Sequence, residues 1–183
     1  MQARVLIIDD GEMFARVLSE QFPEFALVHP EGSDLPRISD GPAALAFLEK
    51  SASDVDVVLL DMNFDVPGDR LLSLGSAFSE RRKRRFQGVA ILREIRRKHP
   101  RLPVVLLTSE ADLSLADLSA EVTTEPMTYF LDSDDADALR IRINEALKEA
   151  SLGLEDAGIL WGSDKTMRAL RRRLSVLARG RLP

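Results

Sequence analysis

The segment VLIIDD, residues 5–10, decides the fold class, because four consecutive apolar residues end directly in two aspartates. Continuous apolar character is typical of a strand that is buried on both faces of a parallel sheet. Three further runs of this kind follow, and each ends at a polar side chain; they are Val55–Leu60, Val104–Leu107 and Met127–Leu131. We therefore expect a parallel sheet with oxygen-bearing side chains at the carboxyl ends of its strands.

Amphipathic stretches with helical spacing lie between these runs and predict helices over residues 14–22, 42–48, 88–98 and 134–150. Asp40 precedes Pro42 as an N-cap candidate for the second of them. Residues 25–38 contain one more strand, either 25–29 or 35–38, and the prolines and glycine there leave both alternatives open. Strands that alternate with helices indicate a doubly wound α/β fold with a five-stranded parallel sheet and helices on both faces.

The composition limits the chemistry that this chain can perform. Its 183 residues, 45% hydrophobic and 30% charged, are enough for one full domain and a small appendage. There is no cysteine and there are only two histidines, so disulfide scaffolds, zinc-thiolate sites and cysteine nucleophiles are excluded. No apolar stretch approaches the roughly 18 residues that span a bilayer, and the expected location is the cytoplasm.

The net charge of −5 is distributed unevenly. Residues 158–183 have seven basic residues and one acidic residue, whereas residues 1–157 have 18 basic and 29 acidic residues, a net charge of −11. An acidic body argues against direct binding of nucleic acid through its phosphates. The local exception is the basic run Arg81–Arg85, which is most simply a solvated loop or helix face.

The aspartates at the strand ends are the candidate functional residues. In an open parallel sheet, ligands bind outside the carboxyl ends of the strands, where Asp9, Asp10 and Asp61 are expected to meet. A single aspartate at such a position is most often a turn or cap residue. Three neighbouring carboxylates repel each other unless a cation lies between them, and Mg²⁺ prefers oxygen ligands of this kind. We therefore expect a magnesium site.

The motifs VLIIDD, VVLLD, VVLLTS and TYFLD, in this order and alternating with helices, resemble the receiver domain of two-component response regulators over residues 3–150. The resemblance implies a flavodoxin-like receiver fold, in which Asp61 accepts a phosphoryl group from a sensor histidine kinase. It implies that Asp9, Asp10, Asp61 and the carbonyl of Asn63 hold Mg²⁺. It also makes Thr108 the hydroxyl that contacts the phosphoryl oxygen, and Tyr129 the switch aromatic; a plain core tyrosine is the alternative at position 129.

The chain departs from the family pattern at two places. Asp132 and Ser133 stand where the family has Lys-Pro, so a carboxylate replaces the ammonium that pairs with the phosphoryl group. The connection from Met62 to Phe86 is also long, with an insertion at about 64–86, and such a connection is usually functional or mobile. Arg70 or the run Arg81–Arg85 would supply a replacement cation if the insertion folded over the site.

Residues 151–157 are expected to be a linker, and residues 158–183 a basic helix with an apolar stripe at Met167, Leu170, Leu174 and Leu177. The stripe fits a short dimerising coil, although it is under three heptads long. The stretch from Gly158 resembles the start of the AAA+ domain of NtrC-type, sigma-54-dependent transcription activators. The chain stops at Pro183 before any phosphate-binding loop, so we expect no ATPase activity. We interpret the chain as the N-terminal portion of a longer regulator or as a short protein left by truncation.

The function expected on this basis is a signalling receiver that regulates transcription, and not an enzyme with an external substrate. One alternative is a pseudo-receiver, which keeps the fold as an interaction module and has lost phosphorylation with the missing lysine. A second alternative is a hydrolase of the haloacid dehalogenase type. That family requires an aspartate two residues after the nucleophile, where this chain has Asn63.

Overall fold

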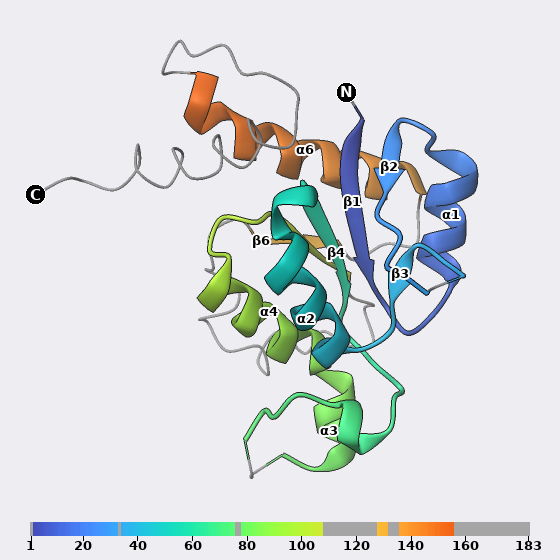
Figure 1. Ribbon diagram of the computed structural model, residues 1–183, viewed down its shortest axis with the longest axis vertical. Helices are drawn as coiled ribbons and strands as arrows, with labels where there is room; N and C mark the ends of the chain where they lie inside the picture. Colours follow the sequence, from blue (N-terminus) through green and yellow to red (C-terminus); the bar gives the residue numbers. More distant parts are fainter. Residues whose placement is uncertain (1, 33, 76–77, 108–127, 132–135, 156–183) are drawn as a thin grey trace, which may run out of the picture.

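The computed structural model describes residues 2–32, 34–75, 78–107, 128–131 and 136–155. Its strands are β1 (Ala3–Ile8), β2 (Phe25–Leu27), β3 (Arg37–Ile38), β4 (Val57–Asp61), β5 (Val104–Leu107) and β6 (Thr128–Leu131). They form one parallel sheet in the order β2-β1-β4-β5-β6 (Figure 1). The expected doubly wound α/β fold is confirmed.

The helices are α1 (Met13–Gln21), α2 (Gly41–Ser51), α3 (Glu80–Arg85), α4 (Gln87–Lys98) and α6 (Ala136–Glu155), with short 3-10 turns η1 (Ala52–Asp54) and η2 (Gly68–Arg70). The Asp40 side chain accepts a hydrogen bond from the Ala43 N–H at 2.8 Å, so the expected N-cap of α2 is confirmed. The α6 helix continues to Glu155, five residues beyond the predicted end and into the expected linker. These last residues include two leucines, which favour a helix, and Gly153, which does not.

Both alternatives for the strand within residues 25–38 are realised. β2 pairs with the first half of β1, and β3 pairs with its last two residues, so the two short strands occupy one edge position of the sheet. The intervening segment contains Pro30 and Pro36, which cannot donate ladder hydrogen bonds, and the edge strand is interrupted there. The five-stranded sheet is therefore observed with its edge strand split in two.

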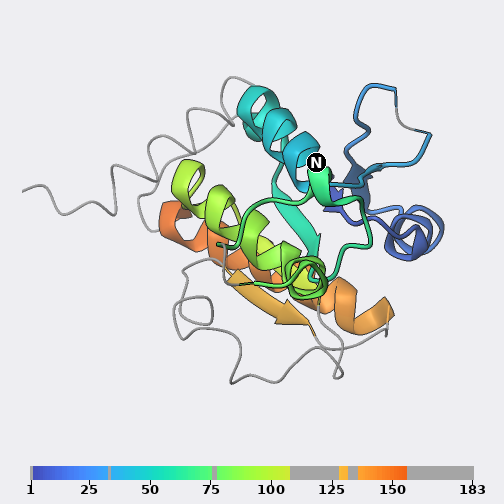
Figure 2. The ribbon, with the colours of Figure 1, turned by 90° about the horizontal axis from the view of Figure 1, so that it is seen from below.

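The sheet is covered on both faces, as expected (Figure 2). Because neighbouring side chains of a strand point to opposite faces, Leu6 and Ile8 pack against the side of α2 and α4, while Val5 and Ile7 pack against α1 and α6. All four side chains are fully buried. This double burial is the physical reason for the continuous apolar runs in the sequence.

The insertion between β4 and α4 forms its own small substructure, with η2 and α3 at its two ends and α3 beyond the end of the α2 and α4 layer (Figure 1). The basic run Arg81–Arg85 makes up most of α3. The buried side chain of Gln87 holds the insertion in place, because it accepts a hydrogen bond from the Leu72 N–H and donates one to the Leu72 carbonyl. The Gln87 side chain thus satisfies both main-chain hydrogen-bonding groups of Leu72, as a neighbouring strand would.

Among the described residues, no helix is both long and apolar enough to cross a membrane. The expected basic helix at 158–183 and the last part of the expected linker lie outside the described residues.

Candidate functional site

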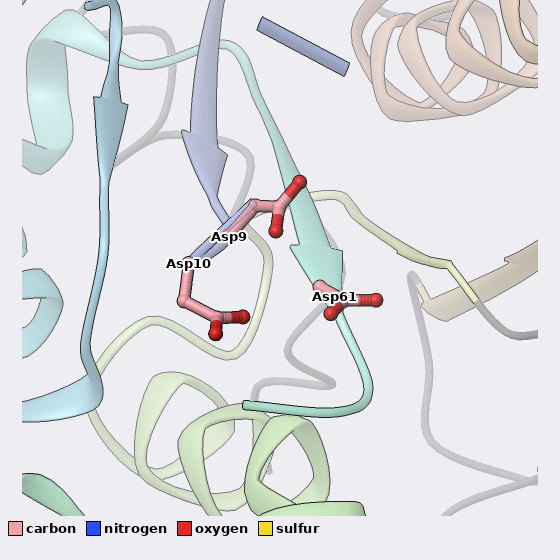
Figure 3. Close-up of side chains that lie close together, drawn as sticks. All are labelled: Asp9, Asp10 and Asp61. Atoms are coloured by element: carbon pink, nitrogen blue, oxygen red, sulfur yellow. The ribbon is translucent and has the colours of Figure 1, made fainter. Parts of the chain in front are cut away.

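Three carboxylates meet at the carboxyl ends of two neighbouring strands. Asp9 and Asp10 follow β1 directly, Asp61 is the last residue of β4, and one carboxylate oxygen of each lies within 4.8 Å of the others (Figure 3). The parallel pairing of β1 with β4, in which Ile8 lies opposite Leu60, brings the two strand ends together. The sequence-based prediction of this cluster is confirmed.

Hydrogen bonds from main-chain N–H groups orient the carboxylates of Asp9 and Asp10. The Asp9 side chain is 5% exposed and accepts a hydrogen bond from the Gly11 N–H at 2.7 Å. Asp10 Oδ2 accepts one from the Asp65 N–H at 2.8 Å, so the beginning of the insertion contacts the cluster directly. The two carboxylates therefore have fixed orientations before any ligand binds.

Burial and mutual repulsion make ionisation of the cluster costly. Burial raises the pKa of Asp61 to about 7, and the nearby charges of Asp9 and Asp10 add to this rise, although the N–H groups of Met62 and Asn63 act against it. Burial also raises the pKa of Asp9. A cation bound between the three oxygens would remove this cost, and carboxylate oxygens suit a hard divalent ion such as Mg²⁺.

Arg37 lies in β3, which pairs with β1 on the side opposite β4. It was not singled out by sequence reasoning. Its Nη1 donates to the main-chain carbonyls of Asp9 at 2.9 Å and Asp10 at 3.0 Å. The only sequence signal was the strand candidate at 35–38; that this strand pairs with the end of β1 depends on the register, which the sequence does not reveal.

Two of the arginines suggested as a replacement cation, Arg70 and Arg84, form ion pairs with carboxylates outside the cluster. Arg70 Nη2 lies 2.7 Å from Asp40 Oδ2 and so pairs with the N-cap of α2. Arg84 in α3 pairs with Asp65 at 2.9 Å and with Glu80 at 3.0 Å. The basic run therefore reaches the loop that borders the cluster and neutralises a carboxylate of that loop.

No family model and no curated protein matches the chain. Among solved structures, a response regulator receiver domain protein from Clostridium thermocellum superposes with a TM-score of 0.54 at 25% identity, over 82% of this chain and 98% of that one. The apo receiver domain of nitrogen regulatory protein C gives a TM-score of 0.51 at 24% identity, over 81% and 98%. The chain has the receiver fold.

A further similar structure is NtrX from Brucella abortus in complex with ATP, with a TM-score of 0.56 at 23% identity, over 94% of this chain. The chain spans 34% of the length of that NtrX structure. These likenesses concern the fold, and the acidic cluster is an observation on this chain itself.

The structure describes only some of the remaining predicted site residues. Asn63 is exposed in the loop after β4, two residues beyond Asp61. Tyr129 lies in β6 opposite Val105, and its side chain is outside the described part of the structure. Thr108 and Asp132 come directly after β5 and β6 in the sequence and also lie outside the described residues, so their roles stay predictions.

Proposed function

We propose that this chain is a response regulator receiver domain that accepts a phosphoryl group on Asp61, with Mg²⁺ held by Asp9, Asp10, Asp61 and the Asn63 carbonyl. The observation that carries the proposal is the meeting of three carboxylates within 4.8 Å at the ends of β1 and β4 in a receiver fold. A sensor histidine kinase is the proposed phosphodonor, and the cytoplasm the proposed location. In this role the chain is a phosphoacceptor and not an enzyme with an external substrate.

The chemistry requires a nucleophile and charge compensation. A carboxylate oxygen of Asp61 attacks phosphorus; a new P–O bond forms, the bond from phosphorus to the donor group breaks, and the donor leaves with its electron pair. When bound, Mg²⁺ would neutralise part of the charge on the acidic cluster and on the transferring oxygens. Asp9 and Asp10 would hold the ion through carboxylates whose positions are set by the N–H groups of Gly11 and Asp65. Thr108 is proposed to contact the phosphoryl oxygen, and Tyr129 to report its arrival by changing side-chain position.

The test is mass spectrometry of the intact protein after incubation with Mg²⁺ and acetyl phosphate. We expect an added phosphoryl mass that disappears in Asp61→Asn and in the presence of EDTA. Asp56→Asn is the matched control, because Asp56 lies just before the opposite end of the same strand and accepts a hydrogen bond from the Arg4 N–H. Phosphorylation that persists in Asp61→Asn would overturn the assignment of the acceptor.

A phosphorylation-independent pseudo-receiver is the second candidate, and the observation that favours it is Asp132 at the position of the family lysine. Asp132→Lys should raise the yield or lifetime of the aspartyl phosphate if residue 132 faces the site, since a repulsive charge pair becomes attractive. Neutralising Arg81–Arg85 together should instead lower the yield if the insertion supplies the cation. Absence of phosphorylation in the parent and in both variants favours the pseudo-receiver.

We further propose that the output is regulation of transcription through a following AAA+ domain of the NtrC type, with self-association as the intermediate step. The support is the resemblance of the stretch from Gly158 and the similarity in fold to NtrX and to the receiver domain of nitrogen regulatory protein C. Light scattering of the chain with and without acetyl phosphate tests the step; we expect the mass to change in the parent and not in Asp61→Asn.

A further inference from the structure

The strands on the β5 side of Asp61 belong to a long part of the sequence that contains no basic residue. Residues 102–139, which include β5 and β6, contain nine acidic residues and no lysine, arginine or histidine. The strands on the β5 side of Asp61 therefore cannot supply a positive charge from their own sequence. Basic residues of the β1 side and of the insertion are therefore the candidates for a resident cation.

On the β1 side, the register of β3 places one arginine beside the cluster. Arg37 pairs with Ile7 across the sheet, and the Asp9 N–H donates to the Ile38 carbonyl at 2.9 Å, so β3 extends to the strand end that carries the acidic pair. The Arg37 side chain is only 17% exposed. A cation so far withdrawn from water acts on nearby charges with little screening.

The contacts of Arg37 fix its position beside the acidic pair. Its Nη1 donates to the carbonyls of both Asp9 and Asp10, which are neutral groups, and one nitrogen thereby joins the two peptide units that present the two carboxylates. Its Nη2 also forms a longer ion pair with Glu12, at 3.9 Å. Arg37 is also one of the groups that lower the pKa of Asp9, against the larger effect of burial.

We propose that Arg37 is a positioning residue that holds the tip of β1 and acts as the resident cation of the acidic cluster. In the metal-free protein it offsets part of the repulsion among Asp9, Asp10 and Asp61. When a divalent ion binds, that repulsion is relieved and the contribution of Arg37 to stability becomes smaller. The effect of the divalent ion rests on the proposed function, whereas the role of Arg37 in the metal-free protein needs only the three carboxylates.

The test is a double-mutant cycle of thermal stability in EDTA, with Arg37→Gln, Asp10→Asn and the double variant. We expect Arg37→Gln to lower Tm by about 2–4 °C in the parent, and by roughly half as much in the Asp10→Asn background, where less repulsion needs to be offset. Equal losses of Tm in the two backgrounds would overturn the proposal.

Arg96→Gln is the matched control, because Arg96 is buried and its Nη1 also donates to a main-chain carbonyl, that of Leu102 at 2.7 Å. Its loss of Tm should be the same with and without Asp10→Asn. Arg37→Lys keeps the charge and gives up the planar guanidinium, and we expect it to keep most of the coupling to Asp10. If Arg37→Lys loses the coupling as completely as Arg37→Gln, the role as a cation is refuted.

Magnesium separates this inference from the proposed function. If the metal site and the role of Arg37 are both correct, Mg²⁺ raises the Tm of Arg37→Gln by more than it raises that of the parent. Arg96→Gln should respond like the parent. If Mg²⁺ leaves the Tm of the parent unchanged, the metal site is refuted, and the cycle in EDTA still decides the role of Arg37.

Discussion

Gly88, the second residue of α4, packs directly on Asp61: a Cβ atom at position 88 would overlap the Asp61 carbonyl oxygen and lie 2.8 Å from the Met62 Cα. The Gly88 N–H donates to the Met62 carbonyl at 3.0 Å. The helix therefore begins against the strand end that carries the candidate phosphoacceptor. Only a residue without a side chain permits this approach of two backbones.

Gly88→Ala should destabilise the protein by about 1–3 kcal/mol, because the added methyl group meets main-chain atoms that cannot move aside cheaply. Urea unfolding measures the change. Gly68→Ala serves as the control, since the nearest atom there would be a carboxylate oxygen of Glu80 at 3.3 Å, the far end of a flexible side chain. A Gly88→Ala protein as stable as Gly68→Ala would show that α4 and β4 separate easily.

The raised pKa of Asp61, about 7, predicts a pH dependence of stability in the metal-free protein. Between about pH 4 and pH 7 the folded protein keeps a proton that the unfolded chain has lost, so the free energy of unfolding falls as pH rises. Above pH 7 it stays at the lower level. Asp61→Asn cannot ionise, and at pH 8 in EDTA it should be more stable than the parent by about 2–4 kcal/mol.

Urea unfolding at pH 5 and pH 8 provides the comparison. The free energy of unfolding of Asp61→Asn should exceed that of the parent by a small amount at pH 5 and by a large amount at pH 8. Glu20→Gln, an exposed carboxylate of α1, should track the parent at both values. An advantage of Asp61→Asn that is the same at both pH values contradicts the assignment of this titration to Asp61.

Magnesium should stabilise the fold by mass action, because the folded protein brings three carboxylates together and the unfolded chain does not. At about 100 times the dissociation constant, the free energy of unfolding should rise by about 2.7 kcal/mol. Asp10→Asn should weaken this response and, without metal, should be no less stable than the parent, since it relieves repulsion. Thermal melting with increasing MgCl₂ checks both, and Asp34→Asn, an exposed residue between β2 and β3, should respond like the parent.

Gln87→Ala should loosen the insertion, because it removes both hydrogen bonds that join α4 to the main chain of Leu72. Limited trypsin digestion detects the change, since Arg81–Arg85 offers cleavage sites within α3. Cleavage there should become faster, while cleavage at Arg97 and Lys98, at the other end of α4, should keep its rate. Unchanged cleavage in α3 would mean that other contacts hold the insertion.

Asp40 and Arg70 should be coupled, because the Asp40 side chain is 4% exposed and accepts from both the α2 N-terminus and Arg70. Asp40→Ala removes the cap and should cost about 1–2 kcal/mol. Arg70→Ala should cost less in the Asp40→Ala background than in the parent, since its partner is already gone. Additive losses in urea unfolding would show that the ion pair contributes nothing.

The runs VLII, VVLL and VVLL predicted three central strands from sequence alone, because a strand buried on both faces must be apolar at every position. The beginning of α2 was equally readable, since Asp40 and Pro42 act through local geometry. The split of the edge strand into β2 and β3 was not readable, because either half alone satisfies the local pattern and only pairing with β1 shows that both are used.

The candidate site was likewise predictable from the sequence only in part. Asp9, Asp10 and Asp61 were predictable, because parallel strands place their carboxyl ends at one edge of the sheet. Arg37, Gln87 and the pairing of Arg70 with Asp40 depend on contacts between residues far apart in the chain. The sequence by itself determined the parallel α/β class and the acidic edge, because both follow from local pattern and strand direction. Only the tertiary structure decided which cations and amides surround that edge, because those positions follow from the register and packing of distant segments.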